Sequence, residues 1–408
     1  MLTVSQALDL ILETSQVLPS QTVTLQDSFG QVLAESLTTP HDSPPFDKSM
    51  MDGFTVDSRT VFEDGMNPLR VTETITAGTL PTQTPGSGTA ARIMTGAPLP
   101  PNADCVIAIE DTEFDEQQPH LVTIPPERVQ AERHVLRQGA AAKAGSPLLT
   151  AGTQLMPQHI AVLAEFGIAQ LQTIPLASVG VLATGNELVP SNEELTPGLI
   201  RNSNEPMLAA QIRRAGATAV PLGIARDNAA ALSRRIAAGL EQDVLLLSGG
   251  VSAGTLDLVP AELAAAGVKQ VFHKVQLKPG KPLWFGILER KQHRCLVFGL
   301  PGNPVSSMVC FEVFVRPTLD ILAGRRPHGS RNQTATLTQD ITIRGNRPTY
   351  FPSTLKRTDT GLVATPVAWG GSADLRSTAL ANGVCCLEPG GDGFTAGTSV
   401  PVICWDNI

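Results

Sequence analysis

Three short stretches in the middle of the chain combine glycine with serine, asparagine or lysine, and two of them also contain proline. They are Ser248-Gly249-Gly250-Val251-Ser252, Lys278-Pro279-Gly280-Lys281-Pro282 and Leu300-Pro301-Gly302-Asn303-Pro304. Glycine lets backbone N–H groups approach a phosphate closely, and lysine supplies positive charge. Each stretch taken alone is equally well explained as an ordinary turn. Together, beside neighbouring apolar runs, they predict three converging loops that hold an anionic, phosphate-bearing ligand.

Acidic side chains accompany these loops. Three acids follow predicted strands or phosphate-type loops, namely Glu187, Asp227 and Asp257. Acids beside a phosphate site are explained if Mg²⁺ bridges them to the phosphates, because Mg²⁺ prefers carboxylate and phosphate oxygens. Each acid also has a structural explanation as a helix cap or a solvated loop residue. The cation site is favoured because the acids converge with three lysines, Lys274, Lys278 and Lys281.

The elements around these loops predict a parallel sheet. Apolar runs at 179–183, 218–224 and 243–247 alternate with helical patterns that end at Gly216 and span 229–240. A β-α-β-α-β order predicts a doubly wound α/β domain with right-handed crossovers. In such a sheet, ligands bind in the crevice at the carboxyl ends of the strands. The fold therefore places the three loops and the acids at one edge.

Two further polar loops precede the sheet. The stretch from Pro44 to Gly53 carries Asp47 and Asp52, and a second turn contains Thr95 followed by glycine. A threonine hydroxyl beside glycine could hold an oxyanion or simply turn the chain. Short strands dominate 41–142, which predicts a small β-rich domain. Short strands also follow Gly324, which predicts a C-terminal all-β barrel or sandwich.

Composition excludes several classes of protein. The length of 408 residues suggests two to three domains at about 150 residues each. A net charge of −8 argues against general nucleic-acid binding, which needs a basic face. The six cysteines form no CxxC pair, and the seven histidines form no HExxH motif. We expect a reduced, cytoplasmic protein with no signal peptide, no catalytic zinc and no membrane span.

Six stretches, in order along nearly the whole chain, resemble the signatures of one family. The family is the molybdopterin molybdenumtransferases of the MoeA type, which are related to the E domain of gephyrin. The stretches are Pro44-Pro45-Phe46-Asp47-Lys48-Ser49-Met50-Met51-Asp52-Gly53, Arg92-Ile93-Met94-Thr95-Gly96-Ala97, Thr184-Gly185-Asn186-Glu187-Leu188, Ser248-Gly249-Gly250-Val251-Ser252, Lys278-Pro279-Gly280-Lys281-Pro282 and Leu300-Pro301-Gly302-Asn303-Pro304.

The resemblance implies four domains and a homodimer. The domains are a linker domain of two segments (1–40 and 143–176), a β-rich insertion (41–142), a molybdopterin-binding α/β domain (177–326) and a C-terminal β-barrel (327–408). It implies an active site between the α/β domain of one subunit and the first two domains of the other. The implied reaction inserts molybdate into adenylated molybdopterin, with Mg²⁺-dependent cleavage of the adenylate and release of AMP. A molybdopterin adenylyltransferase would be the upstream partner.

The resemblance also implies roles for individual residues. The expected catalytic residues are Asp52, Glu187, Asp227, Asp257, Lys274 and Lys278, and the four acids among them would hold Mg²⁺. The expected ligand-binding residues are Thr95, Gly249, Gly250, Ser252, Lys281, Pro301, Gly302, Asn303 and Ser372.

This chain departs from the family pattern at three places. The usual Gly-Glu-Asp-Ile reads Gly139-Ala140-Ala141-Ala142, so both acids are absent. The usual Gly-Asp-Glu-Leu contains Asn186, and Tyr350-Phe351-Pro352-Ser353 lacks an arginine that is usual there, although Arg347 is near. If a missing acid helps to hold cation or molybdate, the cation site is relaxed and activity is weaker.

Two other classes of function compete with the transferase. A non-catalytic binder or carrier of molybdenum cofactor, or a gephyrin-like scaffold, is favoured by the lost acids but disfavoured by the retained lysines and Asp52. A Rossmann-type dehydrogenase ranks far lower, because no G-x-G-x-x-G follows the first strand of the α/β unit.

Overall fold

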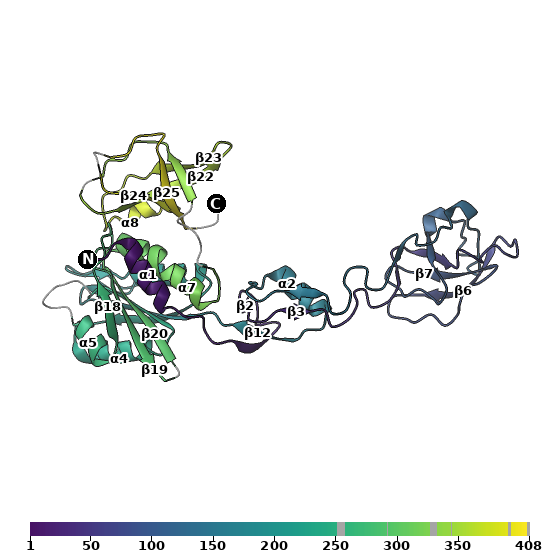
Figure 1. The fold of residues 1–408 in the computed structure, drawn as a ribbon, viewed down its shortest axis with the longest axis horizontal. Helices are drawn as coiled ribbons and strands as arrows, with labels where there is room; N and C mark the ends of the chain where they lie inside the picture. The colour runs from purple at the N-terminus through teal and green to yellow at the C-terminus, as the bar shows by residue number, and fades with distance from the viewer. Residues whose placement is uncertain (251–257, 292, 327–332, 344, 391–392, 406–408) are drawn as a thin grey trace. The chain divides into compact units, whose positions relative to one another are not determined.

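The computed structural model describes residues 1–250, 258–291, 293–326, 333–343, 345–390 and 393–405. The chain forms two compact units (Figure 1), of which one comprises 1–34, 154–160 and 170–408 and the other 35–153 and 161–169. The four-domain division expected from the sequence is finer than these two units and remains a prediction. Among the described residues, no helix is both long enough and apolar enough to cross a membrane.

A six-stranded sheet forms the centre of the first unit, in the order β16-β13-β17-β20-β19-β18. Its strands are β13 (Ser178–Thr184), β16 (Thr218–Ala225), β17 (Val244–Ser248), β18 (Lys269–His273), β19 (Trp284–Arg290) and β20 (His293–Leu300). Strands β16, β13, β17 and β20 run parallel, while β19 and β18 add an antiparallel edge. The predicted doubly wound α/β fold is confirmed.

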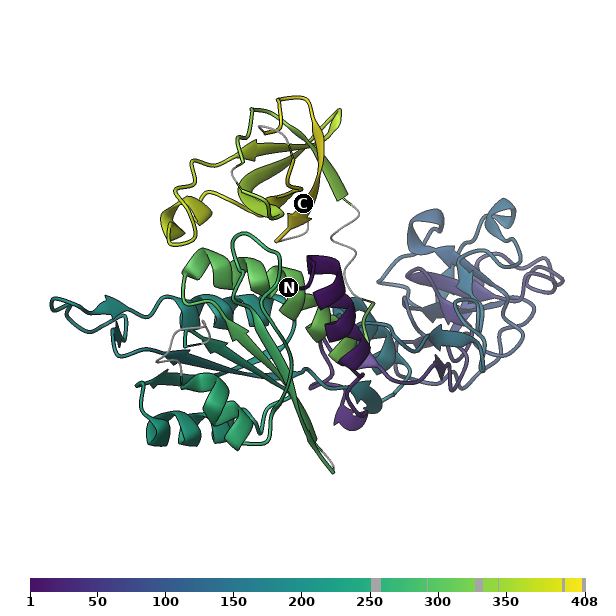
Figure 2. The ribbon, with the colours of Figure 1, turned by 60° about the vertical axis from the view of Figure 1, so that its left-hand side comes forward.

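Helices cover both faces of this sheet (Figure 1 and Figure 2). One face packs against α1 (Val4–Thr14), α3 (Asn204–Arg214), α6 (Pro304–Cys310), the π-helical turn η3 (Phe311–Val315) and α7 (Arg316–Leu322). The opposite face packs against α4 (Ala229–Gly239) and α5 (Val259–Ala265).

Strand β17 contributes to both cores. Leu246 lies in the core on the α3 side, whereas Leu245 and Leu247 lie in the core on the α4 side. Successive side chains of a strand point to opposite faces, so an uninterrupted apolar run is required when both faces are covered. This explains why the run before Ser248 shows no polar alternation.

The rest of the first unit is made of small sheets. A three-stranded sheet has the order β1-β12-β2, and five strands close the barrel that the sequence predicts near the C-terminus, in the order β21-β23-β22-β24-β25. The strands are β1 (Gln21–Thr24), β2 (Val32–Leu33), β12 (Gln170–Ile174), β14 (Leu188–Val189), β15 (Ile200–Arg201), β21 (Gln333–Leu337), β22 (Thr349–Thr358), β23 (Gly361–Pro366), β24 (Gly383–Leu387) and β25 (Ser399–Cys404). A short helix, α8 (Leu375–Thr378), lies between β23 and β24.

The second unit is β-rich, as the sequence predicts. Its five-stranded sheet has the order β8-β5-β7-β6-β9, and two smaller ladders pair β10 with β4 and β11 with β3. The elements are β3 (Leu37–Thr38), β4 (Lys48–Ser49), β5 (Gly53–Val56), β6 (Leu69–Ile75), β7 (Thr89–Ile93), β8 (Cys105–Ala108), η1 (Ile109–Asp111), β9 (Leu121–Val122), η2 (Pro126–Arg128), β10 (Val135–Leu136) and β11 (Pro147–Leu149). Helix α2 (Pro157–Glu165) contributes residues to both units.

Candidate functional site

A cavity of about 500 Å³ opens at the carboxyl ends of the parallel strands. The loops that follow β13, β16, β17 and β20 all line it. Strands β13 and β17 are neighbours, but the next helix after β13 (α3) packs on one face of the sheet and the next helix after β17 (α5) packs on the opposite face, and ligands bind at such a switch point. Seven predicted site residues line the cavity, namely Glu187, Asp227, Gly249, Gly250, Pro301, Gly302 and Asn303.

The glycine loop after β17 has a shape that only glycine permits. Gly249 and Gly250 have φ angles of +90° and +65°. A Cβ on Gly249 would lie 2.7 Å from the carbonyl oxygen of Thr184, and one on Gly250 would lie 2.7 Å from Cγ2 of Val259. Gly249 and Gly250 therefore present no side chains of their own, so their backbone is accessible to a ligand in the cavity.

The two acids of the cavity lie on adjacent loops that are joined through Asn186. The backbone N–H of Asn186 donates to Oδ2 of Asp227 at 3.2 Å, and Asn186 Oδ1 accepts from the N–H of Asp227 at 3.1 Å. Arg226 also donates to the carbonyl of Asn186 at 2.5 Å. The residue that departs from the family pattern thus links the loop of Glu187 to the loop of Asp227.

The two carboxylates do not form a complete metal site. Among the described residues, no three His, Cys, Asp or Glu side chains gather as a potential metal cluster. Mg²⁺ usually keeps several waters and is held by one or two carboxylates plus substrate phosphates. Glu187 and Asp227 in one cavity therefore suit Mg²⁺ bound together with a phosphate ligand. Ser252 and Asp257 lie outside the described residues.

The three predicted lysines belong to the segment that joins β18 and β19. This segment reaches the cavity through Pro282, while the lysines themselves do not line it. Lys274 has a φ of +74° and donates its N–H to Leu283. Lys278 pairs through its backbone with Pro348 and Tyr350, and Lys281 is exposed.

Ser372 is brought to the cavity loops from a distant part of the chain. Its Oγ accepts a hydrogen bond from Nδ2 of Asn303 at 3.0 Å, and its carbonyl accepts from the N–H of Val305 at 3.2 Å. The segment between β23 and β24 is thereby held beside the loop that follows β20. The sequence assigns Ser372 to ligand binding, and the structure places it next to the predicted residue Asn303.

The second unit brings Asp52 and Thr95 into direct contact. Both the backbone N–H and the hydroxyl of Thr95 donate to Oδ1 of Asp52, each at 2.7 Å. These two hydrogen bonds, with the positive charge of Arg92, hold the pKa of the Asp52 carboxyl below its usual value. Both residues are exposed. This pair presents a charged carboxylate and a hydroxyl at one position of the second unit.

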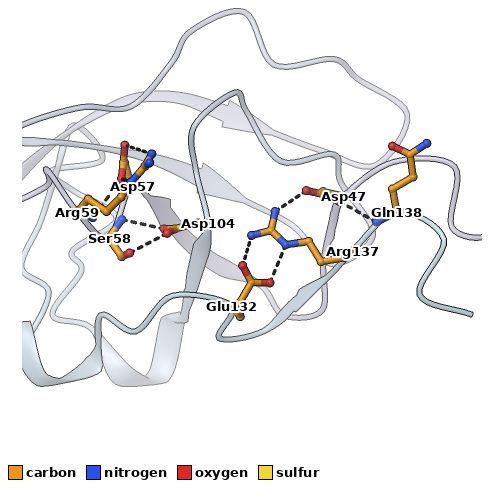
Figure 3. A network of polar contacts seen from close by, with 8 residues as sticks. All are labelled: Asp47, Asp57, Ser58, Arg59, Asp104, Glu132, Arg137 and Gln138. Atoms are coloured by element: carbon orange, nitrogen blue, oxygen red, sulfur yellow. Dashed lines mark hydrogen bonds and ion pairs between the residues drawn. The ribbon is translucent and has the colours of Figure 1, made fainter.

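A polar network supports the loop that carries Asp52. Figure 3 shows Arg137 between Asp47 and Glu132, with ion pairs to both. The N–H of Gln138 also donates to Oδ1 of Asp47 at 2.7 Å. Burial raises the pKa of Asp47, but the hydrogen bonds from Gln138 and Arg137 and the charge of Arg137 outweigh it, so the pKa is lowered.

The turn at residues 139–142, which lacks the usual acids, lies close to this network. The N–H of Gly139 donates to the carbonyl of Pro44, and the N–H of Ala141 donates to that of Ser43, both at 2.9 Å. Residues 139–142 therefore lie against the start of the Asp47 loop. Sequence reasoning missed Arg137, because its partner Asp47 lies 90 residues away and no local pattern links them.

Comparisons with known proteins agree with this architecture. Three family models match the chain: the MoeA N-terminal region (domains I and II) over residues 2–167, a probable molybdopterin-binding domain over 180–321, and the MoeA C-terminal region (domain IV) over 334–405. Every described residue that lines the cavity lies within the second match.

Individual relatives match over most of their lengths. A molybdopterin molybdenumtransferase from Bacillus subtilis (strain 168) is 37% identical over 390 residues, which cover 93% of this chain and 89% of the relative. One from Staphylococcus aureus (strain COL) is 31% identical over 98% of this chain and 94% of the relative. The crystal structure of a MoeA molybdopterin-biosynthesis protein from Pyrococcus horikosii has a TM-score of 0.80 and 29% identity, with full coverage of both chains. The chain belongs to the molybdopterin molybdenumtransferase family.

Proposed function

We propose that this protein works in molybdenum cofactor biosynthesis by inserting molybdate into adenylated molybdopterin, with release of AMP. The observation that carries this proposal is the cavity at the sheet edge. There Gly249 and Gly250, the Pro301–Asn303 loop and two carboxylates line one space within the region that resembles molybdopterin-binding domains.

Backbone groups, serines and lysines contribute to ligand binding in different ways. The backbone of Gly249 and Gly250 and the loop from Pro301 to Asn303 hold the phosphate groups, together with Ser252 and Ser372. Lysine charge neutralises phosphate, and charged hydrogen bonds of this kind contribute about 1.5–3 kcal/mol each. The lysines proposed for this role are Lys274, Lys278 and Lys281, which do not line the cavity themselves but belong to the segment that reaches it through Pro282.

The reaction balances without a further reagent. The dithiolene sulfurs are soft ligands that suit molybdenum. When they bind molybdate, one molybdate oxygen leaves as water with the two thiol protons. Cleavage of the phosphoanhydride P–O bond uses one water and releases AMP. The protein's part is to hold the pyrophosphate and the dithiolene in place until both changes are complete.

Mg²⁺ would be held by Glu187 and Asp227 of the cavity, with Asp257 as a third carboxylate. The charge of the ion polarises a phosphoryl oxygen when it is bound. Asn186 keeps Asp227 on the loop beside Glu187, so the chain supplies two oxygen donors in one cavity before any ligand arrives.

We also propose the four-domain division and a homodimer, in which Asp52 and Thr95 of one subunit complete the site of the other. A molybdopterin adenylyltransferase would supply the adenylated substrate. We also propose that the protein works in the cytoplasm, where cysteines such as these six free thiols stay reduced.

The test is AMP release from adenylated molybdopterin by the purified protein, with and without molybdate and Mg²⁺. We expect release only when both are present. Asp227→Asn should lower the rate at least tenfold, because the amide keeps an oxygen acceptor for Asn186 but loses the charge. Asp359→Asn removes an exposed acid of the barrel and should have no effect. Tight binding of the adenylate without release would favour the carrier or scaffold instead.

A further inference from the structure

Asn204 joins two of the cavity loops through its side-chain amide. It is the first residue of α3, and it lines the cavity. Its Nδ2 donates to Oγ of Ser248 at 2.6 Å and to the carbonyl of Gly302 at 2.7 Å. Ser248 ends β17 and precedes the glycine loop, whereas Gly302 lies in the loop after β20. A single amide nitrogen therefore connects the two phosphate-type loops.

The orientation of this amide follows from its partners. A carbonyl oxygen only accepts hydrogen bonds, so the nitrogen of Asn204, and not its oxygen, must face Gly302. The oxygen Oδ1 is consequently turned away, and it is buried with no hydrogen-bond partner in the part of the chain that the structure describes. A buried acceptor without a partner destabilises a fold, and native structures contain few of them.

Asn382 of the barrel provides the contrast. Its Oδ1 accepts from the N–H of Leu355 at 2.6 Å, and its Nδ2 donates to the carbonyl of the same residue at 2.9 Å. Both halves of that amide are used, as expected for an asparagine that stabilises the fold. Within the part of the chain that the structure describes, Asn204 uses only the nitrogen of its amide, which points to a role other than stability.

The two loops that Asn204 joins lie very close together. A Cβ on Gly302 would lie 3.7 Å from Cα of Gly249, and the N–H of Gly249 donates to the carbonyl of Leu300 at 3.2 Å. The loop after β20 is in turn bonded to Ser372 through Asn303. Loss of the amide of Asn204 would leave this approach of the loops dependent on backbone contacts alone.

We propose that Asn204 is a positioning residue for the transfer reaction, which sets the spacing of the Gly249–Gly250 loop and the Pro301–Asn303 loop. This rests on the proposed function, because the two loops are the ones assigned to the phosphate groups. Asn204 acts by donating two hydrogen bonds, and the lack of a partner for its oxygen among the described residues is the cost of that geometry. The loops hold phosphate in the ground state and the transition state alike, so their spacing governs KM more than kcat.

Two substitutions of Asn204 test the proposal by complementary means. Asn204→Ala removes the amide, and Asn204→Asp keeps its shape but replaces the donor with an acceptor that faces the carbonyl of Gly302. We expect both variants to bind molybdopterin about tenfold more weakly, as measured by titration calorimetry, and to show a matching rise in KM for AMP release. The thermal midpoint of Asn204→Ala should stay close to that of the wild type, because the unpartnered oxygen is lost along with the two hydrogen bonds.

Asn382→Ala is the matched control. It should lower the thermal midpoint, because the N–H and the carbonyl of Leu355 lose their side-chain partner. It should leave molybdopterin affinity unchanged. Wild-type affinity in both Asn204 variants would overturn the proposal. So would wild-type affinity in Asn204→Asp alone, because the donor would then be irrelevant.

The comparison also separates this proposal from the proposed function. If the wild-type protein binds molybdopterin but releases no AMP, the transferase fails while the binding data still decide the role of Asn204. If the wild-type protein does not bind molybdopterin at all, both proposals fail.

Discussion

Asp52 receives two hydrogen bonds on one carboxylate oxygen from Thr95, a residue 43 positions further along the chain. The backbone N–H and the hydroxyl each lie 2.7 Å from Oδ1. Both favour the charged form, so the pKa of Asp52 is lowered and the carboxylate persists as the pH falls. The backbone N–H of Thr95 lowers the pKa of Asp52 most, and the hydroxyl of Thr95 lowers it further.

Thr95→Ala should move the acidic limb of the pH–rate profile to higher pH. The variant loses the hydroxyl donor, so the pKa of Asp52 rises towards its ordinary value and protonation begins at a higher pH. The shift should be partial, because the backbone N–H, which has the larger effect, remains. The measurement is AMP release as a function of pH. Thr95→Ser keeps a hydroxyl and should behave like the wild type, whereas an unchanged limb in Thr95→Ala would show that Asp52 does not titrate in the reaction.

Gly249→Ala should impair both stability and ligand binding, whereas Gly198→Ala should affect stability alone. Both glycines have a φ of +90°, so both substitutions carry the same backbone strain of about 1–2 kcal/mol. A Cβ at Gly249 also meets the carbonyl oxygen of Thr184 at 2.7 Å, while a Cβ at Gly198 meets nothing within 4 Å. Urea denaturation and molybdopterin titration measure the two effects. Equal losses in the two variants would contradict a specific role for the glycine loop.

Arg137→Lys should weaken the support of the Asp47 loop. Lysine is a point charge and cannot reproduce the fork of hydrogen bonds that Arg137 makes to Asp47 and Glu132. Because these groups are partly exposed, we expect a loss of only about 1 kcal/mol in the free energy of unfolding. The rate of AMP release should fall by more than this small loss of stability would cause, because the Asp47 loop also carries Asp52. Arg59→Lys alters an ion pair with Asp57 away from this loop, in which the arginine is more exposed than Arg137, and serves as the control.

The contribution of Asp47 to the free energy of unfolding changes with pH in a definite direction. The pKa of Asp47 is lower in the folded protein, so the charged carboxylate contributes stability above its unfolded pKa of about 3.9. That contribution is lost as the pH falls from the unfolded pKa through the lowered folded pKa. In Asp47→Asn, the free energy of unfolding should therefore decline less steeply below pH 4 than in the wild type. Acid denaturation followed by circular dichroism measures the difference.

Ala141→Asp should raise turnover or lower the Mg²⁺ requirement, because it restores an acid that the family usually carries at this turn. Ala141 is exposed, and its N–H is bonded to Ser43, so the new carboxylate should not alter the fold. AMP release at graded Mg²⁺ concentrations is the measurement. Ala151→Asp introduces the same charge at another exposed site of the second unit. No change in either quantity would refute a role for an acid at position 141.

The sequence by itself determined the α/β fold and the composition of the loops. The apolar run that ends at Ser248 and the helical pattern before Gly216 depend on burial periodicity, which is a local property of the chain. The positive φ angles of Gly249 and Gly250 likewise require glycine whatever surrounds them. For these reasons the sheet, the barrel and the glycine loop could be predicted before any tertiary contact was known.

Only the tertiary structure decided which side chains touch. Asp47 meets Arg137 across 90 residues, and Asn204 meets Ser248 across 44 and Gly302 across 98. No periodicity encodes such pairs, because they arise when separate loops reach the same edge of a sheet or the same turn. The nitrogen of the Asn204 amide makes two hydrogen bonds, while its oxygen has no partner among the described residues. This difference depends on ångström-scale distances, which the order of residues does not specify.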